Sequence, residues 1–216
     1  MRLVVMLVAI LLAGCGIHTR TVRLDLPART VVSPNPGLAV VVLPVIDGRQ
    51  LTNAPSSAGY KIEAGLLKAL GPEKAASLIA GVGDSSKGYA VLLQDEEPVS
   101  ELMRKFVTEI FEAKGYAVYS ASQLHPDAPL VDVRVTQFYL NQPFNFFRAL
   151  TWTNQMKATI ATDVTVSDGR GRRVYSVIGH GANIVQTGKD ANYQETYAKA
   201  MDDYSRDFNA KVFDGL

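Results

Sequence analysis

The first fifteen residues constrain this chain most, because they separate a short apolar leader from the part of the chain that can fold. Arg2 is followed by an apolar run from Leu3 to Leu12. A helix that crosses a bilayer needs about 20 apolar residues, so this run is too short for a permanent span and has the length of a signal-peptide core. Cys15 is the only cysteine. No disulfide can therefore form within the chain, and the fold must depend on an apolar core.

The residues around Cys15 resemble the lipobox of bacterial lipoproteins, in which an aliphatic residue and two small residues precede a cysteine. Here these residues are Leu12, Ala13 and Gly14. The resemblance implies that residues 1–14 are a cleaved signal peptide and that Cys15 carries a diacylglycerol and an N-acyl chain, such as palmitate. Gly16 rather than aspartate follows the cysteine, which favours the outer membrane. We expect a lipid-anchored protein that faces the periplasm. An ordinary secretory signal is the alternative.

The remaining chain is predicted to contain a tether and one domain. Residues 15–36 form the lipidated N-terminus and the tether, since several prolines interrupt regular structure, with room for a short strand at Thr21–Leu26. Residues 37–216 form a single periplasmic domain. Without residues 1–14, 21 basic side chains balance 21 acidic ones. This balance argues against a nucleic-acid partner.

Helical periodicity predicts two main helices. Pro98–Gly115 and Asp190–Phe213 each carry an apolar stripe at spacings of three and four residues. A third region, residues 50–88, is predicted to be a partly helical excursion, with helical stretches at Ile62–Leu70 and Pro72–Ala80.

Strand patterns predict the rest of the domain. Leu38–Ile46 is nearly all apolar, as in a strand buried on both faces, and Pro44 predicts a bulge or an edge position. Two shorter strands are expected at Tyr89–Leu93 and Tyr116–Tyr119. From Leu130 onwards apolar and polar residues alternate, which predicts an antiparallel meander. Its expected buried positions are Val131, Val133, Val135, Tyr139, Met156, Ala158, Ile160, Val164, Val166, Val174, Ser176, Ile178 and His180.

The meander is predicted to turn at Asp168–Gly171, where Asp-Gly-Arg-Gly is typical of a hairpin. Together these elements predict an α/β (α+β) fold. It is a single domain with a mostly antiparallel sheet and two main helices packed on one face.

No catalytic or metal-binding constellation stands out. His18 lies in the tether, His125 in a loop and His180 on a strand, with no pair at zinc-site spacing. No nucleophile elbow is present. Asp95–Glu97 are interpreted as favourable charges before a helix. Asp47-Gly48-Arg49 is interpreted as a local ion pair in a turn. We expect no enzyme activity, no metal and no cofactor other than the lipid on Cys15.

One segment is predicted to be an interaction surface. The connection Asn141–Asn154 gathers aromatic rings around an arginine, a combination typical of protein-binding hot spots. Its candidate partner-binding residues are Phe144, Phe146, Phe147, Arg148 and Trp152. The alternative is that these rings fold back over the sheet or a helix.

The chain also resembles the YajG family of enterobacterial outer-membrane lipoproteins, and more loosely the envelope lipoproteins with a fold like the N-terminal domain of TolB. The resemblance lies in the lipobox and in several structural motifs, which are the valine-rich strand before Asp47-x-Arg49, the helix ending in Lys114-Gly115-Tyr116, the strand Leu130–Tyr139, the hairpin at Asp168–Gly171 and the closing helix. It implies an outer-membrane location and a TolB-N-like fold. The longer segment 50–88 and the aromatic connection depart from the family pattern.

These observations favour an accessory or scaffold role without catalysis. The expected partners are the membrane, through the lipid, and another envelope protein, such as a transporter, a flagellar or secretion assembly, or a peptidoglycan synthase. An oligomer is compatible with this role. Two alternatives stay open, which are a small-ligand or lipid-binding module with a cleft between helix 98–115 and the sheet, and a hydrolase of unrecognised type.

Overall fold

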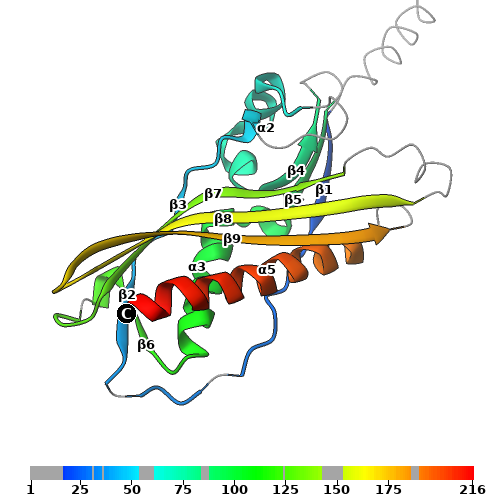
Figure 1. The fold of residues 1–216 in the computed structure, drawn as a ribbon. Coiled ribbons are helices and arrows are strands. Elements are labelled where there is room, and N and C mark those ends of the chain that lie inside the picture. The colour runs from blue at the N-terminus through cyan, green and yellow to red at the C-terminus, as the bar shows by residue number, and fades with distance from the viewer. Residues whose placement is uncertain are drawn as a thin grey trace, which may run out of the picture.

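The computed structural model describes residues 17–30, 32–35, 37–53, 61–83, 88–123, 125–142, 153–185 and 190–216. Within these ranges the chain forms nine strands and three α-helices (Figure 1). The strands are β1 (His18–Val22), β2 (Ala39–Val42), β3 (Ile46–Asp47), β4 (Leu78–Val82), β5 (Tyr89–Leu93), β6 (Ala117–Ser120), β7 (Leu130–Asn141), β8 (Asn154–Asp168) and β9 (Gly171–Val185). The helices are α2 (Ala64–Ala76), α3 (Val99–Glu112) and α5 (Asp190–Val212).

The strands form two sheets. The larger sheet has the order β6-β2-β7-β8-β9, with β3 pairing beside β7. Its β7-β8-β9 part is the predicted antiparallel meander, and the hairpin joins Asp168 to Gly171 as expected. The smaller sheet has the order β1-β5-β4, in which β1 is parallel and β4 antiparallel to β5.

Helices α3 and α5 pack on the same side of the larger sheet (Figure 1). The predicted α5 stripe is buried throughout, from Tyr193 to Val212. One apolar cluster contains both helices and strands of both sheets. A smaller cluster lies between α2 and the other side of the small sheet. The protein is therefore a single α+β domain, as the sequence predicts.

The first long strand is interrupted at its proline. Val40, Val41 and Val42 are all buried, which confirms a strand covered on both faces. β2 ends at Val42, and β3 resumes the pairing with β7 only at Ile46. The break surrounds Pro44, where the sequence predicts a bulge.

The region 50–88 contains a strand that the helical prediction missed. α2 has a kink at Gly71, whose φ is +79°, so it consists of two short helical stretches as expected. The second stretch ends at Ala76 rather than Ala80, because Leu78–Val82 pairs with β5 as β4. Short apolar runs fit a helix or a strand equally well, so periodicity alone could not separate the two here.

A bulge in β7 reverses which side chains face the main core. Val135 pairs with Thr162 and Gln137 with Ala161, so the strand accommodates one extra residue, Thr136. Val131, Val133 and Val135 face the main core as predicted, but Phe138 and Leu140 follow them there. Tyr139 belongs to the smaller cluster instead, which corrects the prediction for this residue.

The buried face of β9 is opposite to the predicted one. Val174 and Ile178 are 61% and 39% exposed, and His180 is exposed as well. The buried face instead carries Gly179 and Gly181, where α5 lies directly on the strand. A Cβ atom on Gly179 would come within 2.2 Å of Ala200 O, and one on Gly181 within 2.1 Å of Thr196 O. The glycines therefore allow the helix backbone to approach the sheet.

Helix α5 also covers the edge of β9. No described strand pairs with this edge, and side chains of α5 form hydrogen bonds with its backbone instead. Ile178 N donates to Asp207 Oδ2 at 2.9 Å, and His180 N donates to Asp203 Oδ2 at 3.0 Å. The second bond is the main reason why the pKa of Asp203 is lowered.

Two lysines extend this set of contacts. Lys211 Nζ donates to Ser176 O at 2.8 Å, and Lys199 Nζ lies 3.5 Å from Ala182 O. Four helical residues rise about 6 Å and two strand residues rise about 6.7 Å. Every fourth residue of the helix therefore lies beside every second residue of the strand. We refer to these four residues as the α5 ladder, namely Lys199, Asp203, Asp207 and Lys211.

The segment predicted as a tether packs against the domain. β1 forms an edge of the smaller sheet, and Val22 and Leu24 are 2% and 7% exposed. Further along, Asp25 N donates to Gln194 Oε1 at 2.8 Å. Arg29 lies over the Phe106 ring at 5.3 Å. The structure therefore differs from the prediction of a tether over these residues, because strand pairing, buried apolar side chains and contacts with α3 and α5 hold the segment on the domain.

Candidate functional site

The residues predicted to carry the lipid or to bind a partner lie outside the described part of the chain. They are Cys15, Phe144, Phe146, Phe147, Arg148 and Trp152. The strands that flank the aromatic connection are described. Asn141 and Gln142, at the end of β7, line a small cavity of about 80 Å³ together with Tyr89. Tyr89 pairs with His18 at the start of β1. One flank of the aromatic connection therefore lies at the same end of the fold as the start of β1.

The histidines do not converge. His18 and His180 lie on different sheets, and both are exposed. His125 packs against the ring of Tyr119, with 5.3 Å between centroids. The described residues contain no group of three or more His, Cys, Asp or Glu side chains placed to hold a metal ion. Among the described helices, none has both the length and the apolar character needed to span a membrane.

The acidic run before α3 is divided between different partners. Asp95 and Glu96 lie in a short turn with φ of +58° and +54°. Glu97 forms an ion pair with Lys105 at 2.7 Å, and Glu96 lies 3.5 Å from Lys74. Glu96 and Glu97 therefore form separate surface pairs rather than part of one acid cluster.

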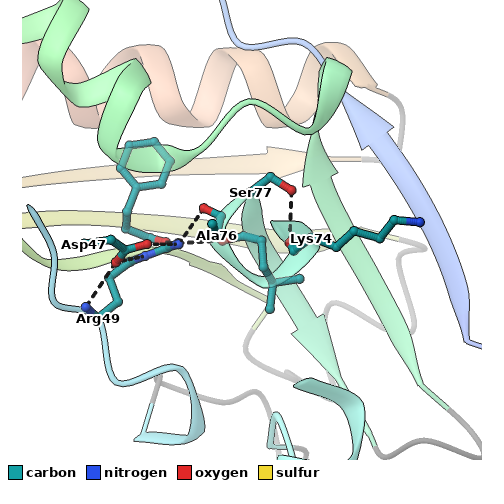
Figure 2. A network of polar contacts seen from close by, with 7 residues as sticks. Asp47, Arg49, Lys74, Ala76 and Ser77 are labelled. Carbon is teal, nitrogen blue, oxygen red and sulfur yellow. Dashed lines mark hydrogen bonds and ion pairs between the residues drawn. The ribbon is translucent and has the colours of Figure 1, made fainter. Parts of the chain in front are cut away.

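The best-defined polar network surrounds Arg49 (Figure 2). The Arg49 side chain is only 3% exposed. Its Nε and Nη2 donate to the two carboxylate oxygens of Asp47 at 2.9 and 2.7 Å. This confirms the predicted ion pair in the turn, with the two-pronged geometry that gives arginine–carboxylate pairs their strength.

The same guanidinium also binds three backbone carbonyls from other elements. Nη2 donates to Ala76 O at 2.9 Å, and Nη1 donates to Leu78 O at 2.6 Å and to Phe138 O at 3.3 Å. All five N–H groups thus have a partner. Ala76 ends α2, Leu78 begins β4 and Phe138 lies in β7, so Arg49 connects the two sheets.

Nearby, Ser77 extends the network at the junction of α2 and β4. Its hydroxyl, which is fully buried, donates to Lys74 O at 3.0 Å (Figure 2). Leu93 N donates in turn to Ser77 O at 2.9 Å. With every donor of Arg49 already used by the protein, we interpret this network as a structural connection and not as a site that binds a ligand.

A cavity of about 350 Å³ lies beside the network. It is lined by the loop that runs from Gly48 to Asn53 and by β7 from Arg134 to Tyr139, including the bulge at Thr136. Arg49 and Phe138 contribute to its wall. Its volume lies within the range of small-molecule pockets. The sequence gives no sign of this cavity, because the loop and the bulge that form it are some 80 residues apart.

Arg134 occupies an unusual position at this cavity. Its register partner on β8 is Asp163, yet the two side chains form no ion pair. Within the described chain, Arg134 has no hydrogen-bond or ion-pair partner. Its guanidinium lies over Gly48 instead, where a Cβ atom would come within 2.4 Å of Arg134 Nε. Gly48 is therefore needed to let this guanidinium lie against the loop.

The cleft expected between helix 98–115 and the sheet is not found among the described residues. Seven side chains of α3 are at most 2% exposed and fill that interface. A cavity of about 440 Å³ borders α3 near Arg23 and Lys105, and Leu93 at the end of β5 also lines it. Both cations are paired there, Arg23 with Asp25 and Lys105 with Glu97, at 2.7 Å each.

Comparisons with known proteins give the chain no family. No family model matches it, and no curated protein matches it. It is similar to a solved structure described as an uncharacterized protein, with a TM-score of 0.45 and 13% identity over 93% of this chain and 99% of the other. A second similar structure is the hypothetical protein CT253 from Chlamydia trachomatis, with a TM-score of 0.32 and 13% identity over 82% of this chain and 96% of the other.

Proposed function

We propose that this protein is a lipid-anchored accessory of the bacterial outer membrane, which faces the periplasm and binds another envelope protein without catalysis. The sequence from Leu12 to Cys15 supports the anchor. The observation that carries the proposal is the short distance from this anchor to the fold. Only Gly16 and Ile17 separate Cys15 from β1, and Ile17 already packs against the smaller apolar cluster.

This distance determines how the domain would lie. Three residues span at most about 11 Å, so lipid on Cys15 would hold the start of β1 near the headgroups. The end of β7 at Asn141 and Gln142 lies at the same end of the fold. The aromatic connection that follows Gln142 would therefore meet its partner close to the membrane surface. A membrane-bound envelope protein, rather than a freely diffusing one, fits this arrangement.

The anchor is tested by replacing Cys15 with serine. We expect Cys15→Ser to abolish incorporation of a palmitate analogue and to move the protein from the membrane fraction to the soluble periplasmic fraction. The reason is that burial of acyl chains, worth about 0.8 kcal/mol per CH₂, is lost. Gly16→Ala, which retains the thiol, is the matched control and should stay labelled and membrane-bound. Membrane association that persists in Cys15→Ser would refute the anchor.

The partner surface is tested by truncating its aromatic rings. Changing Phe146, Phe147 and Trp152 together to alanine is expected to reduce crosslinking to a membrane-bound partner by about tenfold or more, because buried aromatic anchors dominate interface energies. The control replaces Val174 and Ile178, two exposed apolar residues of β9, with alanine. If the aromatic variant captures its partner as efficiently as this control does, the proposed surface is wrong.

A small-ligand role is the second candidate, and one observation favours it. The cavity beside Arg49 has about 350 Å³ of space and polar groups in its wall. Ligand sites combine such a volume with a few well-placed polar groups. This role is compatible with the anchor, since the cavity is formed by residues 48–53 and 134–139 and not by the N-terminus.

A further inference from the structure

The charges around the cavity at β7 are unbalanced. Arg134 and Arg49 both line it, and none of the described lining residues is acidic. The charge of Arg49 is balanced by Asp47, which holds it with two hydrogen bonds. Among the residues that the structure describes, none is such a counterion for Arg134. The cavity therefore presents the guanidinium of Arg134, without a counterion in the described part of the chain, to a bound ligand.

The position of Arg134 is maintained by the local backbone. The absence of a side chain on Gly48 lets the Arg134 side chain lie close to the loop, and it forms no ion pair with Asp163. The bulge at Thr136 lies two residues further along β7 and redirects the side chains that follow. Bulges are common next to binding sites for this reason. The hydrogen bond from Arg49 to Phe138 O holds the backbone beyond the bulge in place.

The remaining lining residues offer neutral donors and an apolar wall. Gln50, Asn53 and Gln137 carry amide groups, and Asn53 already donates to Gln50 Oε1 at 2.8 Å. That bond leaves the amide NH₂ of Gln50 available to a ligand. Leu51 supplies apolar surface, whereas the side chain of Phe138 is buried in the main core. A ligand that carries a pair of negatively charged oxygens next to an apolar group matches these lining residues.

We propose that this cavity binds a small ligand that carries a carboxylate, with Arg134 as the residue that pairs with it. A planar carboxylate accepts two parallel hydrogen bonds from a guanidinium, which makes arginine the favoured partner for this group. The Gln50 amide donates a further bond, and the apolar part of the ligand packs on Leu51. The site is independent of the lipid anchor, so either proposal stands if the other fails.

The test uses the full-length protein in detergent and two probes that differ only in charge. Hippurate has a carboxylate and an aromatic ring, and hippuramide replaces the carboxylate with a neutral amide. Binding is followed by NMR through the side-chain amide signals of Gln50, Asn53 and Gln137. We expect saturable shifts with hippurate and an affinity at least tenfold weaker for hippuramide, since a charge-assisted pair contributes more than a neutral one. Inorganic phosphate serves as a third probe.

Two variants distinguish Arg134 from the rest of the surface. Arg134→Gln removes the exposed cation and should weaken hippurate binding about tenfold, whereas Arg172→Gln, at an exposed arginine of β9, should leave it unchanged. Gly48→Ala retains Arg134 but displaces its guanidinium, and should weaken binding as well. Equal affinity of Arg134→Gln and the native protein would overturn the proposal. So would shifts with phosphate alone, or no saturable shifts with any probe.

Discussion

Replacing Gly179 with alanine is expected to lower the free energy of unfolding by about 3 kcal/mol, although the change adds a single methyl group. The new Cβ would lie 2.2 Å from Ala200 O and 2.5 Å from Tyr204 N. Both are backbone atoms of α5, so no side chain can rotate away to make room. The helix must move off β9, and the buried stripe from Tyr193 to Val212 loses contact with the sheet.

Urea unfolding followed by circular dichroism measures this loss. Gly169→Ala is a suitable control, because Gly169 has no heavy atom within 4 Å of its would-be Cβ, and its effect should stay within about 0.5 kcal/mol. If the two alanine variants unfold at the same urea concentration, the close approach of α5 to β9 is contradicted. Gly181→Ala should behave like Gly179→Ala, since its Cβ would come within 2.1 Å of Thr196 O.

Replacing Arg49 with methionine is expected to cost about 3 kcal/mol or more. Methionine fills much of the same space but leaves the Asp47 carboxylate without its cation. Three backbone carbonyls, those of Ala76, Leu78 and Phe138, also lose their donor. A buried carbonyl that loses its hydrogen-bond donor destabilises the fold, because it has been removed from water without a replacement partner. The expected loss of stability is therefore larger than the loss from breaking an ion pair at the surface.

The comparison for Arg49 is an arginine pair at the surface. Arg104 and Glu101 form an ion pair at 2.7 Å, with side chains 41% and 39% exposed. Arg104→Met should cost less than about 1 kcal/mol, as exposed pairs do. Thermal or urea unfolding of both variants under the same conditions provides the measurement. Equal losses would mean that the carbonyl contacts of Arg49 contribute nothing to stability.

The helices were predictable because a single face of each is buried. The stripe of α5 recurs every three or four residues, and this period is visible in the sequence whatever the helix packs against. The prediction of which β9 side chains are buried, made from the alternation of apolar and polar residues, was wrong for a specific reason. The buried face of β9 carries Gly179 and Gly181, and glycine does not mark a face as either apolar or polar. The apolar residues Val174 and Ile178 lie on the exposed face instead. The backbone of α5 fills the space that side chains would otherwise occupy.

The polar sites were only partly predictable, since their partners lie far apart in the chain. The pair of Asp47 and Arg49 is local and was expected. The carbonyls that Arg49 also binds lie 27, 29 and 89 residues away, at positions where any residue type supplies the same oxygen. No sequence pattern identifies such partners. The cavity at Arg134 depends likewise on a bulge that only the pairing of β7 with β8 reveals.

The α5 ladder has a consequence for how copies of this chain behave when they are concentrated. An unpaired strand at the margin of a sheet is a template on which another chain can polymerise. Here the outward-facing N–H groups of Ile178 and His180 are occupied by the carboxylates of Asp207 and Asp203, held at fixed intervals along a helix. An incoming strand would have to displace these carboxylates first. The ladder thus terminates the sheet at β9 and opposes the addition of another strand at this edge.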